Sequence, residues 1–187
     1  GSSIQISAQN VHQEESGAFT GEISAQMLQS LGVGYVIIGH SERREYFGEN
    51  AKDIAKKVDA VIAQGLTPIY CCGEVKQERE SGNQNQIVGM QIKSELYHLS
   101  PEDFRKVVIA YEPVWAIGTG LTPTLDEINQ VHELIKNFDQ KYINFKVLYG
   151  GSVKSSNSKE ITKLSQVDGC LIGGASLNVD EFNTIIS

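Results

Sequence analysis

Six short apolar runs divide the chain at intervals typical of alternating strands and helices. Runs of four or five residues, rich in β-branched and aromatic side chains, predict buried parallel strands. Between them, residues 50–64 and 125–138 carry apolar side chains at helical spacing. The alternation predicts an α/β fold around a parallel sheet. The predicted strands lie at residues 4–8, 35–38, 67–71, 107–111, 145–149 and 169–172.

The spacing of these strands limits the architecture to a barrel or a doubly wound sheet. Their starts lie roughly 24 to 40 residues apart, which is the length of one βα unit. Polar residues and glycines follow the strand ends, and a closed ring of strands would bring them to one rim. This distribution favours a barrel. The residues concerned lie at 9–10, 39–40, 73–74, 112, 150–152 and 173–174.

Composition indicates one domain, with no linker or shift in composition along its 187 residues. The net charge of −7 and the pI near 5.1 disfavour nucleic acid and anionic membranes as partners, but they allow a local phosphate pocket. No apolar run approaches the ~20 residues that span a membrane, and none resembles a signal peptide. We therefore expect a cytoplasmic protein whose Cys71, Cys72 and Cys170 are reduced thiols.

Glu112 is a candidate general base because it follows the fourth predicted strand directly. A glutamate in this position is more often a helix cap or a surface residue. Here, however, Pro113 supplies a stiff hinge, Trp115 supplies apolar cover, and Gly118 and Gly120 permit a mobile or tightly turned tip. This combination predicts a lid beside a catalytic carboxylate.

His40 follows the second predicted strand at the start of a short helix. A lone histidine is more often structural, but the positive end of the helix dipole disfavours an imidazolium here. We therefore expect a neutral imidazole that donates a hydrogen bond to a carbonyl, while Ser41 caps the helix. His12, His98 and His132 are expected to be solvated or structural.

Two glycine pairs follow the last two predicted strands, at residues 150–151 and 173–174. Each exposes backbone N–H groups, and a single pair is weak evidence because such pairs occur in many turns. Together, before short helices, they match the usual phosphate site of a barrel enzyme. We therefore expect a phosphate ligand at these two glycine pairs.

Several ordered motifs resemble the triosephosphate isomerase family. They are residues 39–44 (GHSERR), 110–120 (AYEPVWAIGTG) and 149–153 (YGGSV). Residues 9–11 and 17–22 are similar to the family's third strand and the long loop after it. The resemblance spans essentially the whole chain and stays in register.

The resemblance implies a (β/α)8 TIM-barrel type of fold, of which about six βα units are present as a single partial domain over residues 1–187. It implies that Glu112 is the base and His40 the electrophile. The reaction implied moves a proton between adjacent carbons through an enediolate, interconverting dihydroxyacetone phosphate and glyceraldehyde 3-phosphate. It implies no metal and no organic cofactor.

The resemblance also assigns residues around this chemistry. Residues 113–123 would form the lid, and Gly118 would donate to the phosphate beside Ser152, Gly173 and Gly174. Glu42 would be a carboxylate next to the site.

Three further positions match the family pattern. Cys71 matches a buried cysteine near the base, although a small core residue is the favoured interpretation. Tyr149 matches a residue that latches the lid through a backbone N–H, yet Pro123 at the matching lid position has none. Thr20 lies on the loop with which the family forms homodimers.

The family has two βα units before the strand that opens this chain, so the resemblance implies units three to eight of a truncated barrel. The Asn-x-Lys motif of the first unit is then absent, and no lysine here occupies its place. Losing one charged contact to the transition state costs orders of magnitude in rate, so we expect a nearly inactive chain. The alternatives are a non-catalytic phosphate-binding scaffold and a partial barrel that complements another fragment.

Overall fold

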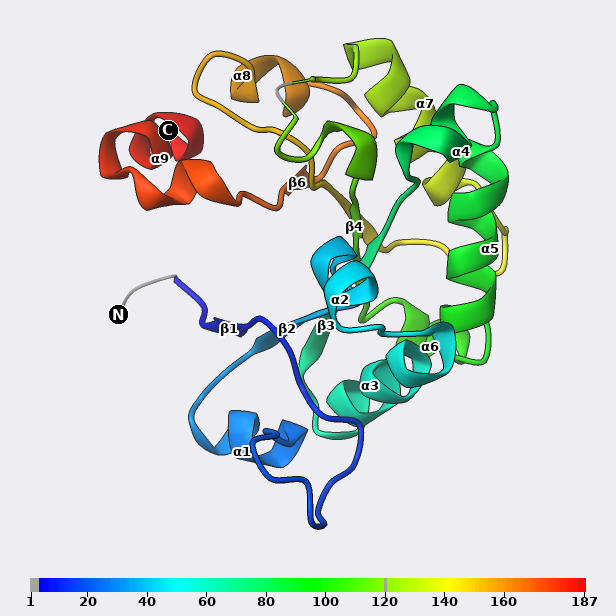
Figure 1. The fold of residues 1–187 in the computed structure, drawn as a ribbon, viewed down its shortest axis with the longest axis vertical. Coiled ribbons are helices and arrows are strands. Elements are labelled where there is room, and N and C mark those ends of the chain that lie inside the picture. The colour runs from blue at the N-terminus through cyan, green and yellow to red at the C-terminus, as the bar shows by residue number, and fades with distance from the viewer. Residues whose placement is uncertain (1–3, 120) are drawn as a thin grey trace.

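The computed structural model describes residues 4–119 and 121–187 and contains a curled sheet of six parallel strands (Figure 1). The strands follow one another in chain order, and each pairs in parallel with the next. This arrangement is a partial TIM barrel of about six units, as predicted. Gly120, which the sequence assigns to the lid, lies outside the described residues, as do residues 1–3.

All six predicted strands are present, but the two outer ones are shorter than expected. The sequence predicts residues 4–8 and 169–172, whereas each outer strand has only two residues. Within the described residues, each has a sheet neighbour on one side only, so fewer ladder hydrogen bonds hold its ends. The strands are β1 (Ser7–Ala8), β2 (Tyr35–Ile38), β3 (Thr67–Cys72), β4 (Val108–Tyr111), β5 (Lys146–Tyr149) and β6 (Gly169–Cys170).

Helices connect successive strands, and the two longest predictions are confirmed with caps at their ends. Asn50 is the N-cap of the helix predicted at 50–64, and Thr124 is the N-cap of the helix predicted at 125–138. The α-helices are α1 (Ala25–Ser30), α2 (Ser41–Tyr46), α3 (Ala51–Ala63), α4 (Lys76–Glu80), α5 (Gln84–Leu96), α6 (Pro101–Phe104), α7 (Leu125–Lys136), α8 (Ser158–Ile161) and α9 (Val179–Ile186). Two 3₁₀ turns are η1 (Val114–Ala116) and η2 (Gly174–Leu177).

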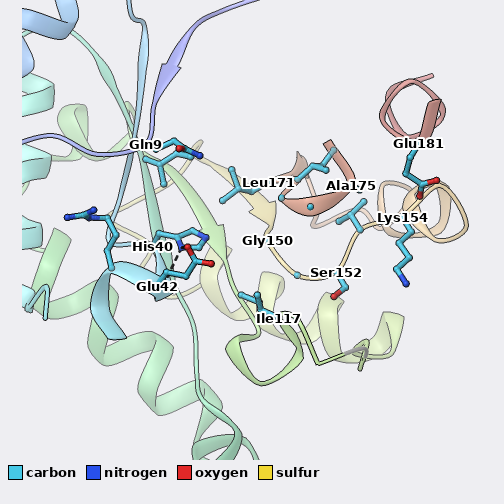
Figure 2. A pocket seen from close by; sticks show the side chains of 18 of the residues that line it. Gln9, His40, Glu42, Ile117, Gly150, Ser152, Lys154, Leu171, Ala175 and Glu181 are labelled. Carbon is cyan, nitrogen blue, oxygen red and sulfur yellow. Dashed lines mark hydrogen bonds and ion pairs between the residues drawn. The ribbon is translucent and has the colours of Figure 1, made fainter. Parts of the chain in front are cut away.

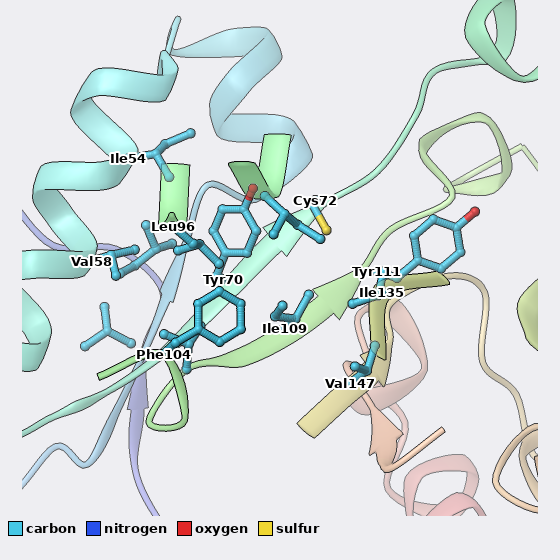
Figure 3. Packing of buried hydrophobic residues seen from close by; sticks show 14 of the residues in the cluster. Ile54, Val58, Tyr70, Cys72, Leu96, Phe104, Ile109, Tyr111, Ile135 and Val147 are labelled. Atoms are coloured by element: carbon cyan, nitrogen blue, oxygen red, sulfur yellow. The ribbon is translucent and has the colours of Figure 1, made fainter. Parts of the chain in front are cut away.

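The hydrophobic core lies between the central strands and the helices α3, α5 and α7. Ile54 and Val58 of α3 and Leu96 of α5 face Tyr70 and Ile109 of the sheet (Figure 3). Each such side chain is almost completely buried, which stabilises the fold by about 1.5–3 kcal/mol per residue relative to exposure. The core therefore fixes the carboxyl ends of β2 to β5, where the candidate site lies.

Among the described residues, no helix is both long and apolar enough to cross a membrane. Cys71 and Cys72 are buried in β3, and Cys170 is partly buried in β6. All three are free thiols.

Candidate active site

A cavity of about 730 Å³ lies at the carboxyl ends of the strands (Figure 2). Six of the predicted site residues line it: His40, Glu42, Gly118, Ser152, Gly173 and Gly174. The sequence analysis missed Lys154 and Arg43, which also line it, and it assigned no role to Gln9. The position of Gln9 just after β1 was the available signal.

Glu112 follows β4 but does not line this cavity. Glu112 is 1% exposed to solvent. Residues at the start of α2 hold its carboxylate by hydrogen bonds. The Ser41 N–H donates to Oε2 at 2.9 Å, and the Ser41 hydroxyl donates to Oε1 at 3.2 Å. His40 Nε2 lies 2.9 Å from Oε1. The structure thus brings the predicted base and electrophile together, with His40 in the cavity lining and Glu112 buried beside it.

The predicted role of Ser41 as a helix cap is wrong. His40 is the N-cap residue, and its Nδ1 accepts a hydrogen bond from the Glu42 N–H at 3.3 Å. Ser41 is the first residue of α2 and uses its hydroxyl on Glu112 instead. A cap side chain accepts from backbone N–H groups, and His40 Nδ1 does this here, so the Ser41 hydroxyl donates to the Glu112 carboxylate instead.

The protonation of His40 is set by two opposing contacts. Its bond from the Glu42 N–H favours the neutral tautomer that carries hydrogen on Nε2. The hydrogen bond to Glu112 acts the other way and raises the pKa of His40, although burial opposes this. The helix start alone predicts a neutral imidazole, whereas contact with Glu112 in this arrangement favours the charged form.

Two glycines let the backbone of neighbouring strands pack closely against Glu112. A Cβ on Gly73 would lie 1.7 Å from the Glu112 carbonyl oxygen, and one on Gly150 would lie 3.1 Å from its Cγ. Gln91 of α5 fixes Gly73 by accepting from its N–H at 2.9 Å and donating to its carbonyl at 3.0 Å. The position of Glu112 is therefore defined from both sides.

The glycine-rich wall of the cavity comes from three loops. Gly118 has a φ of 70°, a left-handed conformation that favours glycine. The Ser152 hydroxyl donates to the Ala116 carbonyl at 3.3 Å and so links the predicted lid to the loop after β5. Added Cβ atoms on Gly173 and Gly174 would meet open space. These loops leave room for an anion near backbone N–H groups.

Four other residues singled out by the sequence lie around the site or away from it. Cys71 is fully buried, and burial together with the charge of Glu112 raises the pKa of its thiol. Glu42 lies beside His40, with its carboxylate 3.9 Å from Nδ1. The hydroxyl of Tyr149 is buried without a hydrogen-bond partner in the described part of the chain. Thr20 is exposed on the loop between β1 and α1.

Parallel βα units with a glycine-rich cavity at their carboxyl ends define a protein of the TIM-barrel class. The family model described as triosephosphate isomerase matches residues 1–187. The chain belongs to the triosephosphate isomerase family. In the described part of the chain, no cluster of three or more His, Cys, Asp or Glu side chains is arranged to hold a metal ion.

Curated relatives carry the same family name. The chain is similar to triosephosphate isomerase of Cytophaga hutchinsonii, at 54% identity over 96% of this chain and 74% of the relative. The protein of that name from Bacteroides fragilis is 50% identical over 98% and 75% of the two chains. The one from Clostridium botulinum is 47% identical over 100% and 78%. The chain thus spans about three quarters of the length of these relatives.

Proposed function

We propose that this chain is an isomerase that interconverts dihydroxyacetone phosphate and glyceraldehyde 3-phosphate. The carrying observation is the 2.9 Å contact between His40 Nε2 and Glu112 Oε1 beside a cavity with glycine-rich loops. The names of relatives at 47–54% identity support the proposal. Glu112 carries the proton between the two carbons, and His40 donates a hydrogen bond to the carbonyl and then to the enediolate oxygen.

The geometry requires one movement of Glu112. Its carboxylate does not line the cavity, so it has to leave Ser41 to reach a substrate carbon. Once it leaves, His40 loses the contact that most raises its pKa, which returns the imidazole toward the neutral form needed for catalysis. Movement of the base and preparation of the electrophile are therefore one event.

The substrate phosphate lies against backbone N–H groups of Gly118, Gly173 and Gly174 together with Ser152. These loops supply partial positive charge without a metal or organic cofactor. Residues 113–123 form the lid that excludes water while the enediolate exists. Cys71 packs behind the base as a core residue, and Glu42 stays at the mouth of the cavity.

We infer that the six units are the third to eighth of the barrel, in a single domain. Within the described residues, β1 and β6 each pair with a strand on one side only, which supports a ring that takes further strands. The lysine that the family uses would come with the first of those units, so we infer that activity of this chain alone is strongly reduced. A homodimer through the Thr20 loop and a cytoplasmic location belong to the same proposal.

Two other functions remain as candidates. A non-catalytic phosphate-binding scaffold would keep the glycine-rich loops and lack turnover. A partial barrel that complements another fragment would acquire activity only with two added βα units. The open edges of β1 and β6 favour the partial barrel that complements another fragment over the phosphate-binding scaffold.

The test is isomerase activity on glyceraldehyde 3-phosphate, with and without the N-terminal quarter of the Cytophaga hutchinsonii relative added in trans. Glu112→Gln should abolish any isomerase activity that is measured. Glu133→Gln, which changes an exposed side chain on α7, should leave the activity unaltered. Turnover that survives Glu112→Gln would refute the proposed mechanism. Phosphate binding in a folded chain without turnover under both conditions would favour the scaffold.

A further inference from the structure

Arg79, on the short helix α4, contacts groups at both ends of the predicted lid. Its Nη2 donates to Glu127 Oε1 at 2.6 Å, and its Nη1 lies 3.6 Å from Glu74 Oε1. Its guanidinium carbon also lies 5.5 Å from the ring centroid of Trp115. Trp115 is at the start of the lid, and Glu127 is in the first turn of α7 directly after it.

At the first end of the lid, Glu74 collects the hydrogen bonds. Its Oε1 accepts from the Trp115 indole N–H at 2.9 Å and from the Tyr111 hydroxyl at 3.0 Å. Its backbone carbonyl accepts from the Val114 N–H at 3.1 Å. Glu74 is fully buried, and burial raises the pKa of its carboxyl, while its hydrogen bonds and the nearby Arg79 guanidinium favour the charged form.

At the second end, the Glu127 carboxylate divides its two oxygens between two tasks. Oε2 accepts from the N–H and hydroxyl of Thr124, at 2.8 and 2.9 Å, and completes a capping box at the start of α7. Oε1 is left for Arg79. Glu127 therefore caps α7 directly after the predicted lid and also holds Arg79, which contacts Glu74 and Trp115 at the start of the lid.

We propose that Arg79 is a positioning residue that couples the two ends of the lid. Its guanidinium is a planar fork with several donors, so it bridges two carboxylates that a lysine could not hold in the same geometry. A shift of Trp115 changes the position of Glu74, and Arg79 passes that change to the first turn of α7. The coupling stands by itself, and only its use in closing over a substrate rests on the proposed function.

The chain offers a direct reporter because Trp115 is its single tryptophan. Among the described contacts, Glu127 reaches Trp115 only through Arg79. Glu127→Gln keeps a side-chain oxygen that can accept from the Thr124 N–H, but it removes the negative charge that pairs with Arg79. Glu133→Gln makes the same chemical change at an exposed position of the same helix and serves as the matched control.

The experiment measures acrylamide quenching of Trp115 fluorescence and hydrogen exchange of residues 113–119 in the whole chain, with and without inorganic phosphate. Loss of a charge-assisted bond should raise exchange in this segment about ten-fold in Glu127→Gln. Quenching should rise with it. Arg79→Gln should show the same change, the double variant no more than either single one, and Glu133→Gln none.

The opposite result is equally definite. If Glu127→Gln loosens only the start of α7 and leaves quenching and exchange at Trp115 as in the parent chain, the two lid ends are independent and the proposal fails. Arg79→Lys, which keeps the charge but not the fork, should recover part of the protection in a coupled lid. All of these readouts are taken without turnover, so a chain that stays inactive even with the N-terminal segment added would overturn the proposed function and leave the coupling intact.

Discussion

Oε1 of Glu112 contacts two donors at the start of α2: His40 Nε2 at 2.9 Å and the Ser41 hydroxyl at 3.2 Å. The Ser41 pair joins residues 71 positions apart in the chain. The two candidate catalytic groups thus share a hydrogen bond in the resting arrangement. The contact between His40 and Glu112 links the position of the proposed base to the charge of the proposed electrophile, and the surroundings of Glu112 lead to predictions about pH, stability and packing.

The stability of the chain should depend on pH through His40. Its folded-state pKa is raised above 6.5, so its contribution is fully present below pH 6.5 and is lost as pH rises through the higher folded value. Glu112→Gln removes the main cause and should flatten this part of the profile. NMR titration measures the pKa of His40, and urea unfolding between pH 6 and 9 measures how stability depends on pH. An unchanged His40 titration in Glu112→Gln would contradict this assignment.

His132 should act in the opposite sense. Burial between α7 and the sheet lowers its pKa from 6.5 to about 4, so the unfolded chain takes up a proton before the folded chain does. Stability is therefore lost as pH falls from 6.5 towards 4, by up to about 3 kcal/mol for this histidine. His132→Gln should remove the loss. Chemical unfolding of both chains at pH 7 and pH 5 tests this, and parallel profiles would exclude His132 as the cause.

Gly73→Ala should strongly destabilise the fold. The new Cβ would lie 1.7 Å from the backbone oxygen of Glu112, so β3 and β4 would have to move apart. We expect a loss of more than about 2 kcal/mol in the free energy of unfolding. Gly34→Ala is the matched control, because its Cβ would meet its nearest neighbour at an ordinary 3.5 Å. Equal midpoints for the two variants in a thermal melt would disprove the packing argument.

Ser41→Ala should destabilise the resting position of Glu112. The variant removes one of the donors to a buried carboxylate and keeps the Ser41 backbone N–H, so a loss of about 1–3 kcal/mol is expected. Ser30→Ala removes an exposed hydroxyl with a local backbone bond and should cost much less. Urea unfolding at pH 7 compares them. A cost for Ser41→Ala no greater than that for Ser30→Ala would show that its hydroxyl contributes nothing to holding Glu112.

The fold was largely predictable because its strands and long helices carry strong local patterns. The apolar runs predicted all six strands, and apolar side chains at helical spacing predicted two long helices, which Asn50 and Thr124 cap in the structure. The ends of β1 and β6 were not predictable, since they depend on how many neighbours a strand has. An apolar run indicates that a strand is buried, but it does not indicate whether a neighbouring strand is present on each side.

The site was predictable in its members and less so in its contacts. Position after a strand end identified His40, and six residues of the prediction line one cavity. The role of Ser41 was missed because its acceptor, Glu112, lies far away in the sequence, and because His40 rather than Ser41 caps the helix. The bridge from Arg79 to Glu127 joins two helices and has no local signal at all.

The buried position of Glu112 also determines which carboxylate solvent-borne chemistry can reach. A water-soluble carbodiimide entering the cavity meets the exposed side chain of Glu42 in its lining, while Glu112 is buried against His40 and Ser41. The resting chain is therefore shielded at the carboxylate that we propose carries the proton. Labelling of Glu112 becomes a measure of how often the carboxylate turns outward.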